Sequence, residues 1–213
     1  MKKGIVLVLG CFLTGCSLLF DGGEPLPLYT LKSLPLKSTY KFGAPLAIDL
    51  PLSESSLNTA RIAVTPSLYQ RDYLADGEWP DRLPKVVQEV LLESLSERWG
   101  GEHVNRNSAG LQTAYVLFSE IQDFSLYYLE TGCAEVRLKI MFKLVDFQNR
   151  RVLAAHTFFE RVSVASFTMT GIVGAFNQAL QTLLEKAVPW MESGISKERV
   201  PHSPKKKLIH KKV

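Results

Sequence analysis

The chain has few cysteines and no long apolar run, and each shortage limits what it can be. Only three of its 213 residues are cysteine, at positions 11, 16 and 133. The most apolar stretch runs from Ile5 to Leu13, far short of the roughly 20 residues that a membrane-spanning helix needs. A disulfide-rich scaffold is therefore excluded, and a transmembrane anchor is disfavoured.

The sequence also lacks the short motifs that mark common enzyme classes. It contains no G-x-S-x-G, H-E-x-x-H or C-x-x-C motif and no phosphate-binding P-loop. Its four histidines are scattered, and we expect His156, in an apolar strand, to be structural. We predict that the protein is not an enzyme and needs no cofactor. A lipid-modifying enzyme is the alternative from a different functional class.

Positive charge is scarce in the body of the chain. The formal net charge is +4, but residues 1–15 carry +2 and residues 197–213 carry +6, which leaves −4 for the body between them. An acidic body disfavours a nucleic-acid-binding face, which needs basic residues to contact phosphates. The lysine-rich residues 196–213 are expected to be a disordered tail. The alternative is electrostatic docking of this tail on anionic lipid or an acidic partner.

The first residues have the layout of a bacterial lipoprotein signal. Two lysines precede the apolar stretch, and Leu13-Thr14-Gly15-Cys16 closes it. This pattern resembles a lipobox, so we expect residues 1–15 to be removed and Cys16 to be acylated. The alternative is an ordinary signal peptide. The resemblance also implies that Ser17, rather than an aspartate, permits sorting to the outer membrane of a Gram-negative bacterium, where the domain faces the periplasm.

Cys133 has no cysteine partner left once Cys11 is removed and Cys16 is acylated. We expect it to be a small buried apolar residue. An intermolecular disulfide or a reactive thiol is the alternative in an oxidising compartment.

The remaining residues are predicted to form a tether, 16–28, and one domain, 29–195. Glycine and proline without hydrophobic periodicity indicate the tether. In the first half of the domain, strands are expected at 28–31, 46–50 and 61–65, with Pro66 ending the third. Residues 73–84 are predicted to be a loop. It leads into a helix at 86–99, with Asp81 as its cap, Pro84 in its first turn and Gly100-Gly101 at its end.

The second half of the domain is predicted to contain three long strands and a helix. The strands are expected at 113–129, 136–145 and 151–164, with a bulge near 122–123 in the first and an antiparallel hairpin joining the other two. Apolar residues at helical spacing predict a helix over 167–191, broken or kinked by Pro189. The predicted fold class is α+β, a mainly antiparallel sheet with two amphipathic helices packed on one face.

Several segments together resemble one family. They are Tyr29-Thr30-Leu31, the stretch from Leu57 to Val64, Tyr73 to Pro84 with its Tyr…Trp…Leu-Pro pattern, Ile121-Gln122-Asp123-Phe124, and Ala175 to Leu180. The chain is similar to the ABC-type transport auxiliary lipoproteins, which include the PqiC-type membrane-integrity lipoproteins. The resemblance covers about residues 28–192. Asn58 stands where the family usually has aspartate, and the lysine-rich tail lies outside the family pattern.

The resemblance implies a docking function. Such lipoproteins work with an MCE-domain protein and an ABC transporter that move phospholipid or other hydrophobic molecules between membranes. Self-association is expected by the same analogy. The alternative is a structural lipoprotein that assists outer-membrane assembly.

Two clusters are candidate sites within this framework. Tyr69, Tyr73 and Trp79 are predicted to form a partner-binding surface, since aromatic residues are enriched at binding hot spots. The alternative is that they pack onto their own core. Four acidic residues between positions 72 and 81 suggest a cation site, but they lack the spacing of an EF-hand. A solvated acidic loop is favoured, and no metal is expected.

Overall fold

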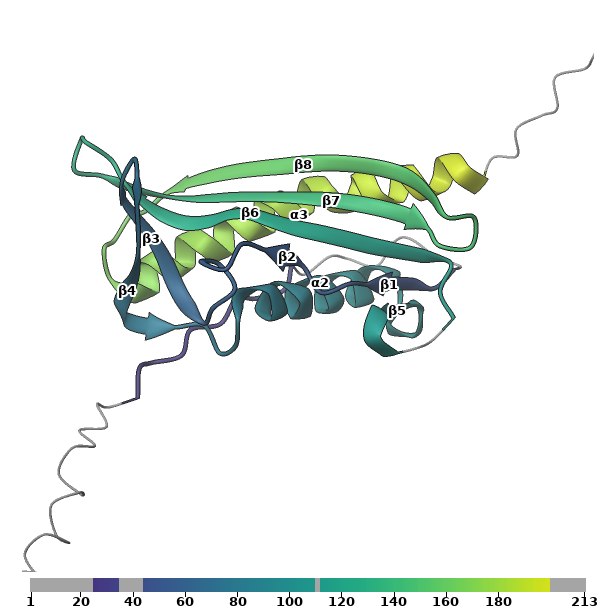
Figure 1. Cartoon of the computed structure of the whole chain (residues 1–213), viewed down its shortest axis with the longest axis horizontal. Helices are drawn as coiled ribbons and strands as arrows, with labels where there is room; N and C mark the ends of the chain where they lie inside the picture. The colour runs from purple at the N-terminus through teal and green to yellow at the C-terminus, as the bar shows by residue number, and fades with distance from the viewer. Residues whose placement is uncertain (1–24, 35–43, 110–111, 200–213) are drawn as a thin grey trace, which may run out of the picture.

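A computed structural model describes residues 25–34, 44–109 and 112–199 (Figure 1). They form an eight-stranded sheet, two α-helices and two short 3₁₀ turns. The elements in chain order are β1 (Leu46–Ile48), β2 (Leu52–Ser53), β3 (Arg61–Ser67), β4 (Gln70–Glu78), α2 (Leu83–Trp99), η1 (Gly101–His103), β5 (Val104–Arg106), η2 (Asn107–Ala109), β6 (Tyr115–Tyr128), β7 (Ala134–Asp146), β8 (Arg151–Ser163) and α3 (Met169–Arg199). Cys16 and Ser17 lie outside the described residues.

Strand β6 organises the sheet. One edge of β6 pairs antiparallel with β7 along nearly its whole length, and β8 pairs antiparallel with β7. The other edge of β6 pairs in parallel with β1, β2 and β3 in succession. The sheet is therefore mixed, and the prediction of a mainly antiparallel sheet was wrong. The reason is that α2 lies between β3 and β6 in the chain, and such a crossover returns the second strand in the same direction as the first.

Strand β7 follows its predicted alternation. Along β7, the residues Val136, Leu138 and Ile140 alternate with side chains that remain partly exposed. This alternation gives the strand one face in the core and one face outside. The register between β6 and β7 shifts between Ile121 and Asp123, which confirms the predicted bulge.

The predicted loop at 73–84 was wrong in its first half. Residues 70–78 form β4, which pairs antiparallel with β3. Five of the nine β4 residues are polar, a composition typical of a loop, but an edge strand tolerates it because one side faces solvent. Pro66 also does not end the preceding strand, since β3 continues to Ser67.

The N-cap of helix α2 lies one residue after the predicted cap, Asp81. Its N-cap is Arg82, and Pro84 lies in the first turn as predicted. Asp81 accepts a hydrogen bond from the Arg82 amide at 2.7 Å and one from Lys85 at 2.5 Å. The helix ends at Gly100, whose φ of 91° is left-handed and favours glycine.

Helix α3 continues through Pro189 to Arg199, so the predicted break was wrong. Proline removes one hydrogen bond to the preceding turn, but Val188, Met191 and Ile195 are all buried around it. Burial of this apolar face holds the helix together across the proline.

Both helices cover the same face of the sheet, as predicted. Glu192 of α3 accepts hydrogen bonds from the Arg98 Nε atom at 2.8 Å and the Trp99 Nε1 atom at 2.9 Å, both at the end of α2. One core cluster joins residues of both helices and of the sheet. The opposite face of β6, β7 and β8 carries no helix (Figure 1).

Two further features complete the fold. Cys133 is exposed in the turn between β6 and β7, so the prediction that it is buried was wrong. A tight turn at a sheet end has no second layer to cover it.

Across the described ranges, no helix combines the length and the apolar character needed to cross a membrane.

Candidate functional site

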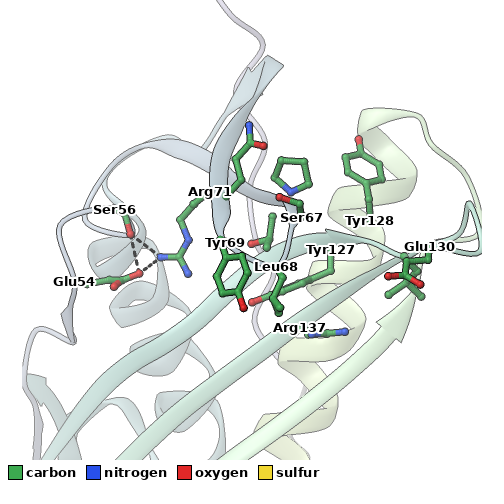
Figure 2. A pocket seen from close by; sticks show the side chains of 14 residues that line it. Glu54, Ser56, Ser67, Leu68, Tyr69, Arg71, Tyr127, Tyr128, Glu130 and Arg137 are labelled. Carbon is green, nitrogen blue, oxygen red and sulfur yellow. Dashed lines mark hydrogen bonds and ion pairs between the residues drawn. The ribbon is translucent and has the colours of Figure 1, made fainter.

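The candidate site is a groove between the ends of two hairpins. Strands β3 and β6 pair for the last time where Thr65 lies opposite Tyr127. The next residue of β3 is Pro66, which has no amide hydrogen to extend the ladder. The β3–β4 hairpin and the β6–β7 hairpin then border an open groove of about 890 Å³ (Figure 2).

Part of the rim of the groove is apolar. Ser67 pairs with Gln70, which leaves Leu68 and Tyr69 as the two residues of the β3–β4 turn. Their exposed fractions are 83% and 96%. On the other side of the groove lies Tyr128, 44% exposed, whose ring stacks on Phe167 with centroids 6.5 Å apart. We call Leu68 and Tyr69 the hairpin tip.

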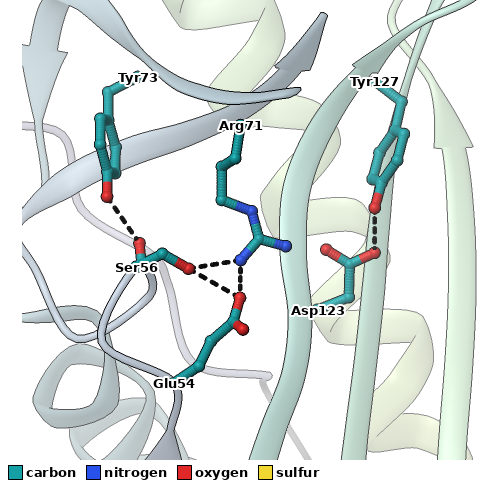
Figure 3. Close-up of polar contacts among 6 residues, drawn as sticks. All are labelled: Glu54, Ser56, Arg71, Tyr73, Asp123 and Tyr127. Atoms are coloured by element: carbon teal, nitrogen blue, oxygen red, sulfur yellow. Dashed lines mark hydrogen bonds and ion pairs between the residues drawn. The ribbon is translucent and has the colours of Figure 1, made fainter. Parts of the chain in front are cut away.

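One wall of the groove is a paired polar cluster. Arg71 of β4 forms an ion pair with Glu54, and its Nη1 donates to the Ser56 hydroxyl at 2.6 Å (Figure 3). That hydroxyl donates to Glu54 at 2.7 Å. The Tyr73 hydroxyl donates to the backbone oxygen of Ser56 at 3.1 Å. These contacts fix the segment that contains Glu54 and Ser56 against β4.

The floor is formed by Tyr127 and its neighbours. The Tyr127 hydroxyl donates to Asp123 Oδ2 at 2.8 Å (Figure 3). Arg137 lies over the Tyr127 ring, 4.0 Å from its centroid, and its Nε donates to Glu135 at 2.6 Å. Burial raises the pKa of Tyr127, and the hydrogen bond to Asp123 raises it further. The phenol is therefore held in its neutral form.

This arrangement is suited to binding and offers no catalytic set. Both arginines of the groove are ion-paired, and the neutral phenol donates to a carboxylate instead of being activated by a base. Over the residues that the structure describes, no group of three or more His, Cys, Asp or Glu side chains is placed to hold a metal ion. The groove combines exposed apolar side chains at part of its rim with two ion-paired arginines, and its lining also includes the exposed carboxylate of Glu130.

The three aromatic residues predicted as a surface lie in three different environments. Tyr69 is at the exposed rim. Tyr73 is partly buried, and Arg61 stacks over its ring at 3.9 Å. Trp79 is 1% exposed and packs edge-to-face on Phe124 and Phe176, at centroid distances of 6.1 and 5.5 Å. The alternative of core packing therefore holds for Trp79, whereas Tyr73 is partly buried and Tyr69 is exposed.

Sequence reasoning missed Leu68, Tyr127 and Arg137. For Leu68 a signal was present, since Leu68-Tyr69 follows Pro66-Ser67 at a position where a turn is expected and turn residues are usually small or polar. Tyr127 and Arg137 carried no local signal, because the pairing of β6 with β7 is what brings them together. Asp72 and Asp76 are exposed, in agreement with a solvated acidic segment.

Comparison with known proteins adds a family and a fold. The model of a family described as the ABC-type transport auxiliary lipoprotein component matches residues 29–188. A curated uncharacterized protein of Bradyrhizobium diazoefficiens is 26% identical over 148 residues, which is 69% of this chain but only 39% of that protein's length.

Two solved structures share the fold. A protein of Xanthomonas campestris has a TM-score of 0.68 and 18% identity, over 81% of this chain and 96% of its own. A second uncharacterized protein has a TM-score of 0.58 and 14% identity, over 78% of this chain and 98% of its own.

Proposed function

This chain belongs to the family of ABC-type transport auxiliary lipoprotein components, and on that premise we propose that it is a docking component of an MCE-type ABC system. In this proposal Cys16 carries the lipid anchor, and Ser17 directs the protein to the outer membrane, where the domain faces the periplasm. The system moves phospholipid or another hydrophobic molecule between membranes. Its other components are an MCE-domain protein and the ABC transporter.

The observation that carries the proposal is the family match across nearly the whole described domain. The groove agrees with a binding function, because its arginines are ion-paired and the apolar part of its rim is exposed. Of the three aromatic residues, we propose that Tyr69 alone makes a contact outside the chain.

Photo-crosslinking in native cells tests the proposal. A photoreactive residue replaces Tyr69 at the rim, Phe159 on the outer edge strand β8, or Phe147 in the β7–β8 turn, all three of which are exposed. We expect at least one position to capture an MCE-domain protein. The matched control is the unsubstituted chain irradiated in the same way, which captures nothing.

The outcome also separates the alternative function. Capture of a barrel-assembly or lipopolysaccharide-transport protein, without an MCE-domain protein, would support the structural lipoprotein and contradict the proposal. The position that captures the partner identifies the docking surface.

A further inference from the structure

We propose that the hairpin tip inserts into the surface of the same bilayer that holds the lipid anchor, so that the groove end of the domain rests on lipid. The inference deepens the proposed function and depends on its lipid anchor at Cys16. It assigns the exposed Leu68 and Tyr69 to a membrane contact.

The residues of the tip are not explained by the fold. A two-residue hairpin turn favours glycine, asparagine or aspartate. Neither Leu68 nor Tyr69 has a positive φ, and both side chains extend into solvent. Folding thus gains nothing from an apolar pair at this turn. A turn that breaks the usual residue preference without a folding benefit is expected to serve a contact.

The chemistry of this end fits a membrane interface. Leucine is suited to the boundary between headgroups and acyl chains, and tyrosine rings are enriched at the headgroup level. Across the groove, Tyr128 and the stacked Phe167 add a second exposed aromatic pair. The groove arginines Arg71 and Arg137 are ion-paired and the tip itself carries no charge, so we expect the contact at the tip to be apolar.

The position of the tether favours lipid over a distant protein. Leu28 bridges Glu78 at the far end of β4 from the tip, about 27 Å away for a strand of this length. Cys16 lies twelve positions before Leu28, and twelve extended steps of the chain span at most about 40 Å. A bilayer that holds Cys16 is therefore within reach of the tip.

The opposite end of the molecule points away from that bilayer. The described N-terminal segment and both hairpin ends lie at one end of the long axis, and the last turn of α3 lies at the other (Figure 1). The 31 residues of α3 span about 46 Å at 1.5 Å per residue. The β7–β8 turn at the far end, which carries the exposed Phe147, is thus held away from the lipid surface.

A fluorophore at the tip tests the inference. The full-length chain with Cys133→Ser and Tyr69→Cys is expressed with its signal, purified and labelled with NBD. It is then reconstituted into vesicles of phosphatidylethanolamine and phosphatidylglycerol. The matched control carries the same label through Phe147→Cys, at a site that is 55% exposed at the other end. The readouts are quenching by spin-labelled lipid and by aqueous iodide, and intact mass verifies the acyl anchor independently.

We expect lipid quenching and iodide protection at position 69 but not at position 147, with little change when salt is raised. Adding Leu68→Ser to the chain labelled at position 69 should lower the ratio of inserted to free tip about tenfold. This substitution should leave the circular dichroism spectrum unchanged, since Leu68 packs on nothing.

Equal accessibility at the two labelled sites would overturn the inference. So would protection of position 69 that appears only when a purified MCE-domain protein is added, because the tip would then be a protein contact. An acylated chain whose tip stays exposed refutes the membrane contact alone, and absence of acylation refutes the anchor of the proposed function.

Discussion

Tyr69 and Trp79 show how differently two aromatic residues of one hairpin region are used. Tyr69 stands at the turn, almost entirely in solvent, whereas Trp79 follows β4 and closes the core between β6 and α3. The Trp79 amide also donates to the Ala60 oxygen at 2.7 Å. The two residues should therefore differ sharply in their effect on stability.

Trp79→Ala is expected to lower the free energy of unfolding by about 3–5 kcal/mol, because it opens a cavity in an aromatic cluster. Tyr69→Ala, the matched control, should change it by no more than about 0.5 kcal/mol. Urea denaturation of both variants provides the measurement. A large loss with Tyr69→Ala would show that the tip packs on the domain after all.

Tyr127 should make stability depend on alkaline pH. Its pKa is raised in the folded state, above the usual value of about 10. Its stabilising contribution is therefore fully present below that pH and is lost as the pH rises through the folded-state pKa. Tyr127→Phe should remove this dependence, and Asp123→Asn should weaken it.

The measurement is the free energy of unfolding at several pH values from neutral to alkaline, together with the phenolate absorbance. Tyr69→Phe removes a phenol from the exposed tip and serves as control. If Tyr127→Phe and Tyr69→Phe give the same alkaline profile, the buried hydrogen bond of Tyr127 has no energetic role.

At the scale of elements, the contact between α2 and α3 depends on one carboxylate. Glu192 accepts from both Arg98 and Trp99, and its side chain is largely buried. Glu192→Ala should cost about 1–3 kcal/mol, since it removes hydrogen bonds from a partly buried polar contact. Glu185→Ala, on the exposed side of α3, should cost less than about 0.5 kcal/mol.

Thermal denaturation of the two variants distinguishes these values. Equal and small shifts would mean that apolar packing alone fixes the angle between the helices. Glu192→Gln should recover part of the loss, because the amide oxygen still accepts a hydrogen bond.

The elements that could be predicted are those whose pattern is local. Alternation along β7 and the helical spacing of α3 depend on which face meets the core, and both elements were predicted, although α3 continues past its predicted end to Arg199. Strand β4 was missed because it lies at an edge, where its polar residues resemble a loop. The parallel pairing of β1, β2 and β3 with β6 joins residues far apart in the chain, and no local pattern encodes it.

The candidate site was less predictable for the same reason. Tyr69 was identified by residue type, but the groove exists only because β3 and β6 separate after Thr65 and Tyr127. Trp79 is an aromatic residue of the same region as Tyr69, but Trp79 is buried and Tyr69 is exposed. Residue type therefore indicated the region and could not separate surface from core.

At the scale of the whole molecule, the proposed anchor and sorting position make a prediction in cells. Cys16→Ala should retain residues 1–15, because the acylated thiol is needed for removal of the signal. Ser17→Asp should move the protein from the outer to the inner membrane, whereas Ser17→Ala should not. Intact mass and density-gradient fractionation of membranes are the measurements. An unaltered location of Ser17→Asp would contradict the proposed sorting role.

The position of β6 in the sheet also sets an order of folding. Its parallel partners β1, β2 and β3 precede it in the chain. Its antiparallel partner β7 follows directly after it, and β8 pairs in turn with β7. Local pairings form faster than distant ones because less chain entropy is lost. We expect the β6–β7–β8 meander and the local β3–β4 hairpin to form first, whereas β1 and β2 pair only when they reach β6. Pulsed hydrogen exchange should then detect protection of the β7 amides before that of the β1 amides. The strands that follow the N-terminal tether in the chain, β1 and β2, would therefore join the sheet last.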